Sequence, residues 1–216
     1  MGPGMRESRA VYNKACSIIP DDREYFSVFE EKRTVLICGS AFPSPDSRGN
    51  AGCMRALDVA SDCFMERPFL SEMALDNIGE IVNREVYEMQ DSDKSFMCSL
   101  AMLYIFKGRT RVCPAGHASV MFYETDELKN VWVGDGTLLG SKPDHKAVYS
   151  DEFELKKDCR FILITGGSKE DVDLATDYFK ENKGAVPEDT EEFLKGRQCS
   201  YANLFLPERE KRGFLR

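Results

Sequence analysis

Two glycine-bearing loops stand out as places where chemistry could be built. Ala115-Gly116-His117 and Thr165-Gly166-Gly167 each follow a short apolar run within residues 109–169. Loops at the ends of rigid strands are where binding and catalytic groups are usually placed. Such glycine turns can present backbone N–H groups to an anion, although an ordinary tight turn uses the same residues. Gly116, His117 and Gly167 are therefore candidate anion-facing positions, and a purely structural turn is the favoured interpretation of the same residues.

The cysteines and histidines favour neither a zinc site nor a cysteine nucleophile. The chain has eight cysteines, and no two of them are spaced as Cys-x-x-Cys. Cys113 and His117 form the one close Cys/His pair, whereas a structural zinc site needs four ligands. A cysteine phosphatase needs an arginine six residues after its cysteine, and none of the eight has one. Walker A, GxSxG and HExxH motifs are also missing from the sequence.

The composition is that of an ordinary globular protein. Hydrophobic residues make up 42% and charged residues 31% of the 216 positions. A chain of this length is expected to form one domain with a full core. The net charge of −8 gives no general attraction to nucleic acid or to an anionic membrane. Cysteines inside apolar patterns, in a domain that needs no disulfides, predict a reducing, cytoplasmic location.

Hydrophobic periodicity predicts a segregated order of strands and helices. Two strands come first and two helices follow, at residues 25–29, 34–38, 51–66 and 72–89. About six strands are next, including residues 97–106, 112–115, 119–123, 130–133 and 161–165. Two helices and a closing strand complete the chain, at residues 170–182, 190–194 and 201–206.

Short hairpin links between the strands favour antiparallel sheets with helices packed outside, an α+β layered fold. The folded domain is expected to span residues 15–206. Residues 1–14 are expected to form a flexible N-terminus and residues 207–216 a charged tail.

The order of these segments resembles the metal-dependent protein Ser/Thr phosphatases (PPM), a sandwich of two antiparallel sheets flanked by helices. It is most similar to the bacterial SpoIIE-type branch, whose members act on phosphorylated anti-anti-sigma and stress-regulator proteins. The likeness spans about residues 15–206 and is carried by three segments: the Ala-Gly-His turn at 115–117, the Leu-Gly turn at 138–143, and the strand at 153–165 that enters the Thr-Gly-Gly loop.

The resemblance implies a site for paired Mg²⁺ or Mn²⁺ ions, held by carboxylates from several strand ends. Asp22, or alternatively Asp21, stands at the first of these positions. The other positions carry no carboxylate, because they are occupied by Gly39, Gly166 and Ser200. Glycine offers only a backbone carbonyl, so the charge that draws dications together is lost. The resemblance thus implies a degenerate centre with no cofactor and no assigned catalytic residue.

Three other side chains could restore some chemistry. Asp46 could act as a substitute ligand, although an Asp between Pro45 and Ser47 is typical of a turn. Asp135-Gly136 imitates the missing Asp-Gly pair, but its position between two apolar runs predicts a hairpin turn. His117 could act as a base, yet the family has the same Ala-Gly-His turn without that role.

These observations favour a pseudophosphatase. Such a protein would be a cytoplasmic module that binds a protein partner, such as a phosphorylated regulator, in bacterial-type stress or sporulation signalling. The alternative from another class is an active or weakly active Mn²⁺- or Mg²⁺-dependent phosphoserine/phosphothreonine phosphatase that uses Asp22. A domain that acts only through homo-oligomer contacts is a third reading. Converging carboxylates would distinguish the enzyme from the binding module.

Overall fold

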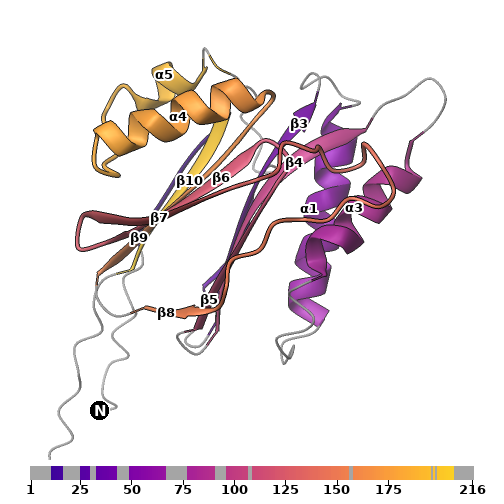
Figure 1. Cartoon of the computed structure of the whole chain (residues 1–216), viewed down its shortest axis with the longest axis horizontal. Helices are drawn as coiled ribbons and strands as arrows, with labels where there is room; N and C mark the ends of the chain where they lie inside the picture. The colour runs from indigo at the N-terminus through magenta and orange to yellow at the C-terminus, as the bar shows by residue number, and fades with distance from the viewer. Residues whose placement is uncertain are drawn as a thin grey trace, which may run out of the picture.

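The computed structural model describes residues 11–16, 25–29, 33–42, 49–66, 77–90, 96–106, 109–155, 158–195, 197 and 199–206. Two five-stranded antiparallel sheets form the inner layers, and helices cover both outer faces (Figure 1). This arrangement confirms the α+β sandwich predicted from the segregation of strands and helices. Among the described residues, no helix has the length and apolar character needed to cross a membrane.

The first sheet has the strand order β1-β10-β9-β6-β7. Its strands are β1 (Val11–Cys16), β6 (Ala118–Glu124), β7 (Glu127–Val133), β9 (Cys159–Gly166) and β10 (Cys199–Leu206). β1 pairs with β10 from Val11 onward, so the sheet begins inside the segment expected to be a loose terminus. Helices α4 (Lys169–Glu181) and α5 (Thr190–Lys195) lie on its outer face, where Phe179 and Val172 pack on Ile162 and Ile164.

The second sheet has the strand order β2-β3-β4-β5-β8. Its strands are β2 (Tyr25–Phe29), β3 (Arg33–Phe42), β4 (Met97–Phe106), β5 (Arg109–Ala115) and β8 (Phe153–Glu154). Helices α1 (Gly49–Glu66) and α3 (Ile78–Glu88) pack on its outer face through Leu57, Phe64 and Val82. The predicted helix at 72–89 is thus described from residue 78, since residues 67–76 lie outside the described part.

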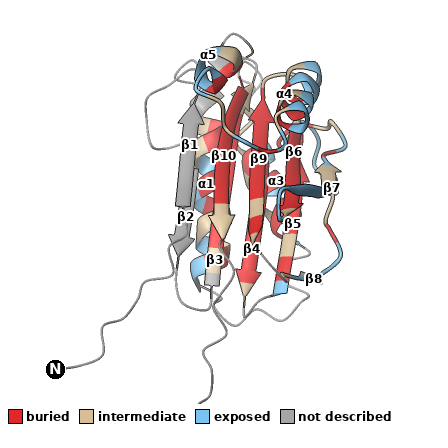
Figure 2. Ribbon diagram, turned by 90° about the vertical axis from the view of Figure 1, so that its left-hand side faces the viewer, coloured by how far each residue is buried: buried red, intermediate tan, exposed pale blue. Residues whose placement is uncertain are grey.

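Besides the two cores under the helices, a third hydrophobic core lies between the two sheets. It explains the long apolar runs of the sequence. Leu36, Leu103 and Val112 of the second sheet meet Phe161 and Leu163 of the first. Central strands are therefore buried on both faces and read as continuous hydrophobic segments rather than as alternating ones. Figure 2 shows β9, β10 and β6 buried along most of their length. Each fully buried large apolar side chain contributes roughly 1.5–3 kcal/mol to this packing.

The segment after β7 differs from the hairpin expected at Asp135-Gly136. The pair does form a turn, in which Asp135 Oδ1 accepts a hydrogen bond from Thr137 N at 2.8 Å and Gly136 has a φ of 82°. The chain does not return along β7, however. It crosses to the α3 side, where Leu139 forms an isolated bridge with Cys98 of β4, and then descends to β8 (Figure 1). Tertiary packing on α3 overrides the local hairpin preference.

Candidate functional site

The two sheets are joined by a buried hydroxyl pair where β3 of one sheet passes β9 of the other. Ser40 Oγ lies 2.8 Å from Thr165 Oγ1, and Cys38 Sγ lies 3.4 Å from the same Thr165 oxygen. Ser40 is 7% exposed, and Cys38 and Thr165 are fully buried. On β10, Ser200 stands opposite Thr165 in the strand register and is also buried. Small neutral side chains from three strands therefore gather at this point.

Position 39 faces away from that point. A Cβ added to Gly39 would lie 2.8 Å from Cys53 Sγ on α1 and 3.0 Å from Leu100 Cδ2. Successive residues of a strand point to opposite faces, so Cys38 and Ser40 face the first sheet while residue 39 faces α1. Ser40 is therefore the site residue that sequence reasoning missed. The alternation of side chains along a strand could have indicated Ser40, but only if β3 had been known to continue to Phe42.

The structure brings the two predicted glycine loops together. His117 Nδ1 donates to the carbonyl oxygen of Gly167 at 3.1 Å, and Gly166 N–H donates to His117 O at 3.1 Å. The backbone N–H of His117 donates to Ser99 Oγ at 2.9 Å. Because the Gly167 carbonyl can only accept, the neutral His117 ring keeps its proton on Nδ1 and leaves Nε2 as the unprotonated nitrogen.

Glycine is required at position 116 by backbone geometry and by close packing. Its φ is 78°, and an added Cβ would lie 2.8 Å from Ser99 Oγ. An L-residue with a side chain is strained in that left-handed conformation. This explains the glycine in structural terms, and the anion-facing role of Gly116, His117 and Gly167 stays a prediction.

The donor set of the strand ends that the structure describes does not fit a two-metal centre. Mg²⁺ and Mn²⁺ prefer carboxylate and other hard oxygen ligands. Cys38, Ser40 and Thr165 supply a thiol and two hydroxyls that are already bonded to one another. Within the described ranges, no group of three or more His, Cys, Asp or Glu side chains could hold a metal ion.

The aspartates singled out as ligands, Asp21, Asp22 and Asp46, lie outside the described residues. The roles assigned to Gly39, Gly166 and Ser200 as degenerate metal positions therefore stay predictions.

The positive end of α4, next to the Gly166-Gly167 loop, is already neutralised by the chain itself. Ser168 caps the helix by accepting from Asp171 N at 3.1 Å, and its hydroxyl donates to Asp171 Oδ2 at 2.6 Å. Glu170 and Asp171 place two carboxylates in the first turn. Acidic groups there complement the helix dipole, so this helix end needs no external anion.

Cys113 and His117 contribute to different parts of the molecule. Cys113 lies in the core beneath α1 and α3, where burial raises the pKa of its thiol well above the ordinary value. His117 instead bonds to Gly167, directly after β9. The two side chains therefore do not converge on a common metal site.

Solved structures show what this architecture is similar to. No protein-family model matches the chain. No curated protein sequence matches it. The PPM Ser-Thr phosphatase MsPP from Mycobacterium smegmatis aligns over 92% of this chain and 98% of its own, with 12% identity and a TM-score of 0.60.

Two further structures align equally fully. PppA, a regulatory component of the T6SS in Pseudomonas aeruginosa, has 10% identity and a TM-score of 0.62 over 93% of this chain and 97% of its own. The catalytic domain of the phosphatase PstP in complex with two manganese ions has 10% identity and a TM-score of 0.59 over 91% and 96%. At these identities the likeness concerns architecture, and we conclude that the chain has the fold of the PPM Ser/Thr phosphatases.

Proposed function

We propose that the chain is a pseudophosphatase, a regulatory module that binds a protein partner on a phosphatase fold without hydrolysing phosphoester bonds. The observation that carries the proposal is the Ser40–Thr165 hydroxyl pair, which fills the junction of β3 and β9 with neutral groups. Hydrolysis of this kind needs charge to neutralise the phosphate and to activate water. Neutral, mutually bonded hydroxyls provide neither.

A binding role for the same end of the molecule is supported by the fixed arrangement of its two glycine loops. The Gly116-His117 and Gly166-Gly167 loops are held next to each other by hydrogen bonds between them. His117 Nε2 is left as the ring nitrogen through which a protonated imidazole could donate to a phosphate oxygen. We propose a phosphorylated regulatory protein as the partner, in stress- or sporulation-type signalling in the cytoplasm. PppA, which has the same fold, is a regulatory component of the T6SS, and this supports a regulatory role here.

The second candidate is an active Mn²⁺- or Mg²⁺-dependent phosphoserine/phosphothreonine phosphatase. It is favoured by the two manganese ions bound to PstP, which has the same fold. In this chain it would depend on Asp22, with Asp21 as the alternate, because the described strand ends carry neutral donors.

Calorimetric titration of the metal-stripped chain with Mn²⁺ distinguishes the two functions. The pseudophosphatase should give no saturable heat, and no phosphate release from a phosphoserine peptide above a protein-free control. It should also show no stabilisation in a melt, whereas a ligand at a hundred times its dissociation constant stabilises a fold by about 2.7 kcal/mol. Asp22→Ala should behave as the unsubstituted chain.

Saturable Mn²⁺ binding, together with phosphate release that Asp22→Ala abolishes, would establish the enzyme instead. The binding role has its own measurement. Titration with inorganic phosphate should give heat that His117→Ala reduces, and equal heats for the two proteins would remove His117 from the proposal.

A further inference from the structure

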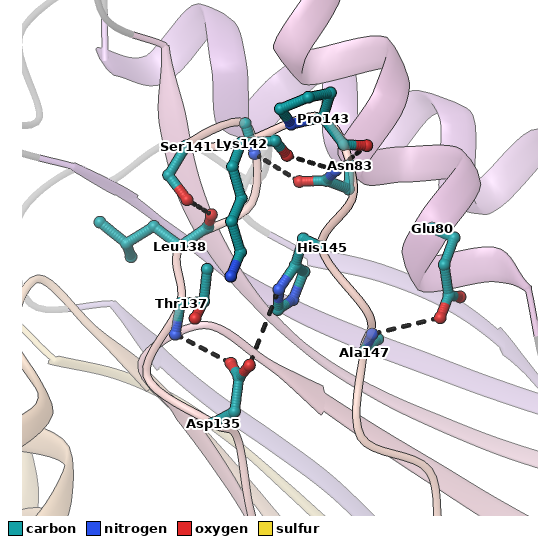
Figure 3. Close-up of polar contacts among 11 residues, drawn as sticks. Glu80, Asn83, Asp135, Thr137, Leu138, Ser141, Lys142, Pro143, His145 and Ala147 are labelled. Carbon is teal, nitrogen blue, oxygen red and sulfur yellow. Dashed lines mark hydrogen bonds and ion pairs between the residues drawn. The ribbon is translucent and has the colours of Figure 1, made fainter.

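The long connection between β7 and β8, residues 134–152, is held against α3 by two side chains. Asn83 Nδ2 donates to Lys142 O at 2.9 Å, and Asn83 Oδ1 accepts from Gly140 N at 2.9 Å. One turn earlier on α3, Glu80 Oε1 accepts from Ala147 N at 3.2 Å and Glu80 Oε2 accepts from the hydroxyl of Tyr149. Figure 3 shows both anchors and the loop that they hold.

His145 lies between these anchors and is the one buried histidine of the loop. It is 2% exposed, and neither ring nitrogen has a hydrogen-bond partner. Its nearest ionic neighbour is Asp135, whose Oδ2 lies 3.7 Å from His145 Nδ1, beyond hydrogen-bond distance (Figure 3). Asp135 itself is 40% exposed and keeps its other oxygen on Thr137 N. The ring is therefore enclosed without being satisfied.

The charges around His145 do not compensate for its burial. Burial lowers the pKa of His145, and Lys142 of the same loop lowers it further. Asp135 of the loop and Glu80 of α3 act in the opposite direction without reversing the shift. The flanking Asp144 and Lys146 point to solvent. His145 is therefore neutral in the closed loop at pH 7, and a proton added there would create a buried and poorly paired cation.

The turn that faces His145 is in contact with one of the strand-end glycine loops, so a movement of this turn would displace that loop. Asp135 follows Gly134, whose N–H donates to Ala118 O at 2.9 Å. A Cβ added to Gly134 would lie 2.4 Å from the carbonyl oxygen of Gly116. The turn that faces His145 is therefore packed directly on the loop that carries Gly116. Trp132 of β7, the only tryptophan of the chain, lies just before this turn.

We propose that His145 is a pH-sensitive latch, which closes the loop of residues 134–152 on α3 when the ring is neutral and releases it when the ring is protonated. The released loop exposes the ring to water and binds the proton more tightly than the closed loop does. Protonation therefore favours release as the pH falls below about 6.5, the ordinary histidine pKa. The closed state is fully favoured above that pH. This latch does not depend on the proposed pseudophosphatase role.

Amide hydrogen exchange and imidazole NMR on the full chain, from about pH 8 to about pH 5, test the latch. The chain has only two histidines, so the ring signals of His145 can be assigned by comparison with a His117→Gln variant. We expect His145 to titrate below the ordinary histidine pKa. In the same interval, protection factors in residues 134–152 should fall by about tenfold per pH unit, since one proton is coupled to opening. Protection of β9 should stay constant, as should that of the β4 amides other than Cys98, whose N–H donates to Leu139 O of the loop. Trp132 emission should follow the loop.

Two variants keep the proposal falsifiable. His145→Leu cannot be protonated and should remove the pH dependence of loop protection. If that variant does not fold, Asp135→Asn decides, because it removes a carboxylate that favours the charged ring in the closed loop. The His145 ring should then titrate at lower pH, and loop protection at about pH 5 should fall further than in the unsubstituted chain. Loop protection that does not change with pH in the unsubstituted chain would overturn the proposal. So would an unchanged transition in either variant.

Discussion

Gly79 of α3 is a position where a normally stabilising substitution should destabilise the protein. Replacing glycine by alanine inside a helix usually stabilises it by about 0.8–1 kcal/mol. Here a Cβ at residue 79 would lie 2.3 Å from Ala147 Cβ and 3.0 Å from the Tyr149 hydroxyl. Both neighbours belong to the loop that is held on α3, so relief requires the loop backbone to move away from the helix.

The expected size follows from these opposing effects. Overpacking of a close-packed contact typically costs 1–3 kcal/mol, and a clash between two backbone-attached carbons lies at the upper end, about 3 kcal/mol. After the helix gain is subtracted, Gly79→Ala should lower the free energy of unfolding by about 2 kcal/mol. Urea denaturation with an unchanged m value measures this loss directly.

The matched control removes the opposing methyl group, that of Ala147. Ala147→Gly removes the Cβ that the new methyl group would strike, so the double variant Gly79→Ala/Ala147→Gly should recover most of the loss. The coupling free energy of the cycle should be about 3 kcal/mol, because the helix gain is present with and without Ala147→Gly and cancels, and this is within the range for residues in direct contact. If Gly79→Ala alone stabilises the chain, or if the two changes are additive, the loop does not pack on α3 as described.

Other parts of the structure make similarly direct predictions. Thr165→Val leaves the buried Ser40 hydroxyl without its 2.8 Å partner and should cost about 1–3 kcal/mol in urea denaturation; a neutral result would mean that the pair does not form. Asn83→Ala strands the buried N–H of Gly140 and should cost a similar 1–3 kcal/mol, with faster amide exchange in residues 134–152, whereas unchanged exchange would remove Asn83 as an anchor. Burial raises the pKa of Cys98 and of Cys199 to about 12. Both thiols should therefore resist alkylation by iodoacetamide at about pH 8 until urea is added. Labelling of either thiol in the native protein, measured by peptide mass spectrometry, would contradict their burial.

Most of the fold could be predicted because its local patterns agree with its tertiary structure. The apolar runs at residues 97–106 and 161–165 became central strands buried on both faces, and the helical periodicities at residues 51–66 and 170–182 became α1 and α4 to within a few residues. One exception was β1, which lies mostly in the expected loose terminus, and another was Asp135-Gly136. Its turn chemistry was predicted correctly, but the strand that should have followed was replaced by a loop anchored on Asn83 and Glu80.

The candidate site was harder to predict, because its contacts join residues that are far apart in the chain. Gly116 and His117 were identified from the strand-end position of their loop, which is a local property. Ser40 was missed, because its hydrogen bond to Thr165 spans 125 residues and exists only when the two sheets are stacked. Strand alternation alone also could not show that residue 39 faces α1, since the face that a residue occupies depends on which side the second layer packs.

By itself, then, the sequence determined the layered α+β class, the order of the strands and helices after β1, and the glycine loops, because periodicity and turn chemistry act between residues that are near neighbours in the chain. Only the tertiary structure decided that hydroxyls meet between β3 and β9, that Gly79 must leave room for Ala147, and that His145 is enclosed without a hydrogen bond. The physical reason is that burial, close approach and missing hydrogen-bond partners are properties of packed surfaces. They arise only when segments from distant parts of the chain exclude water from one another.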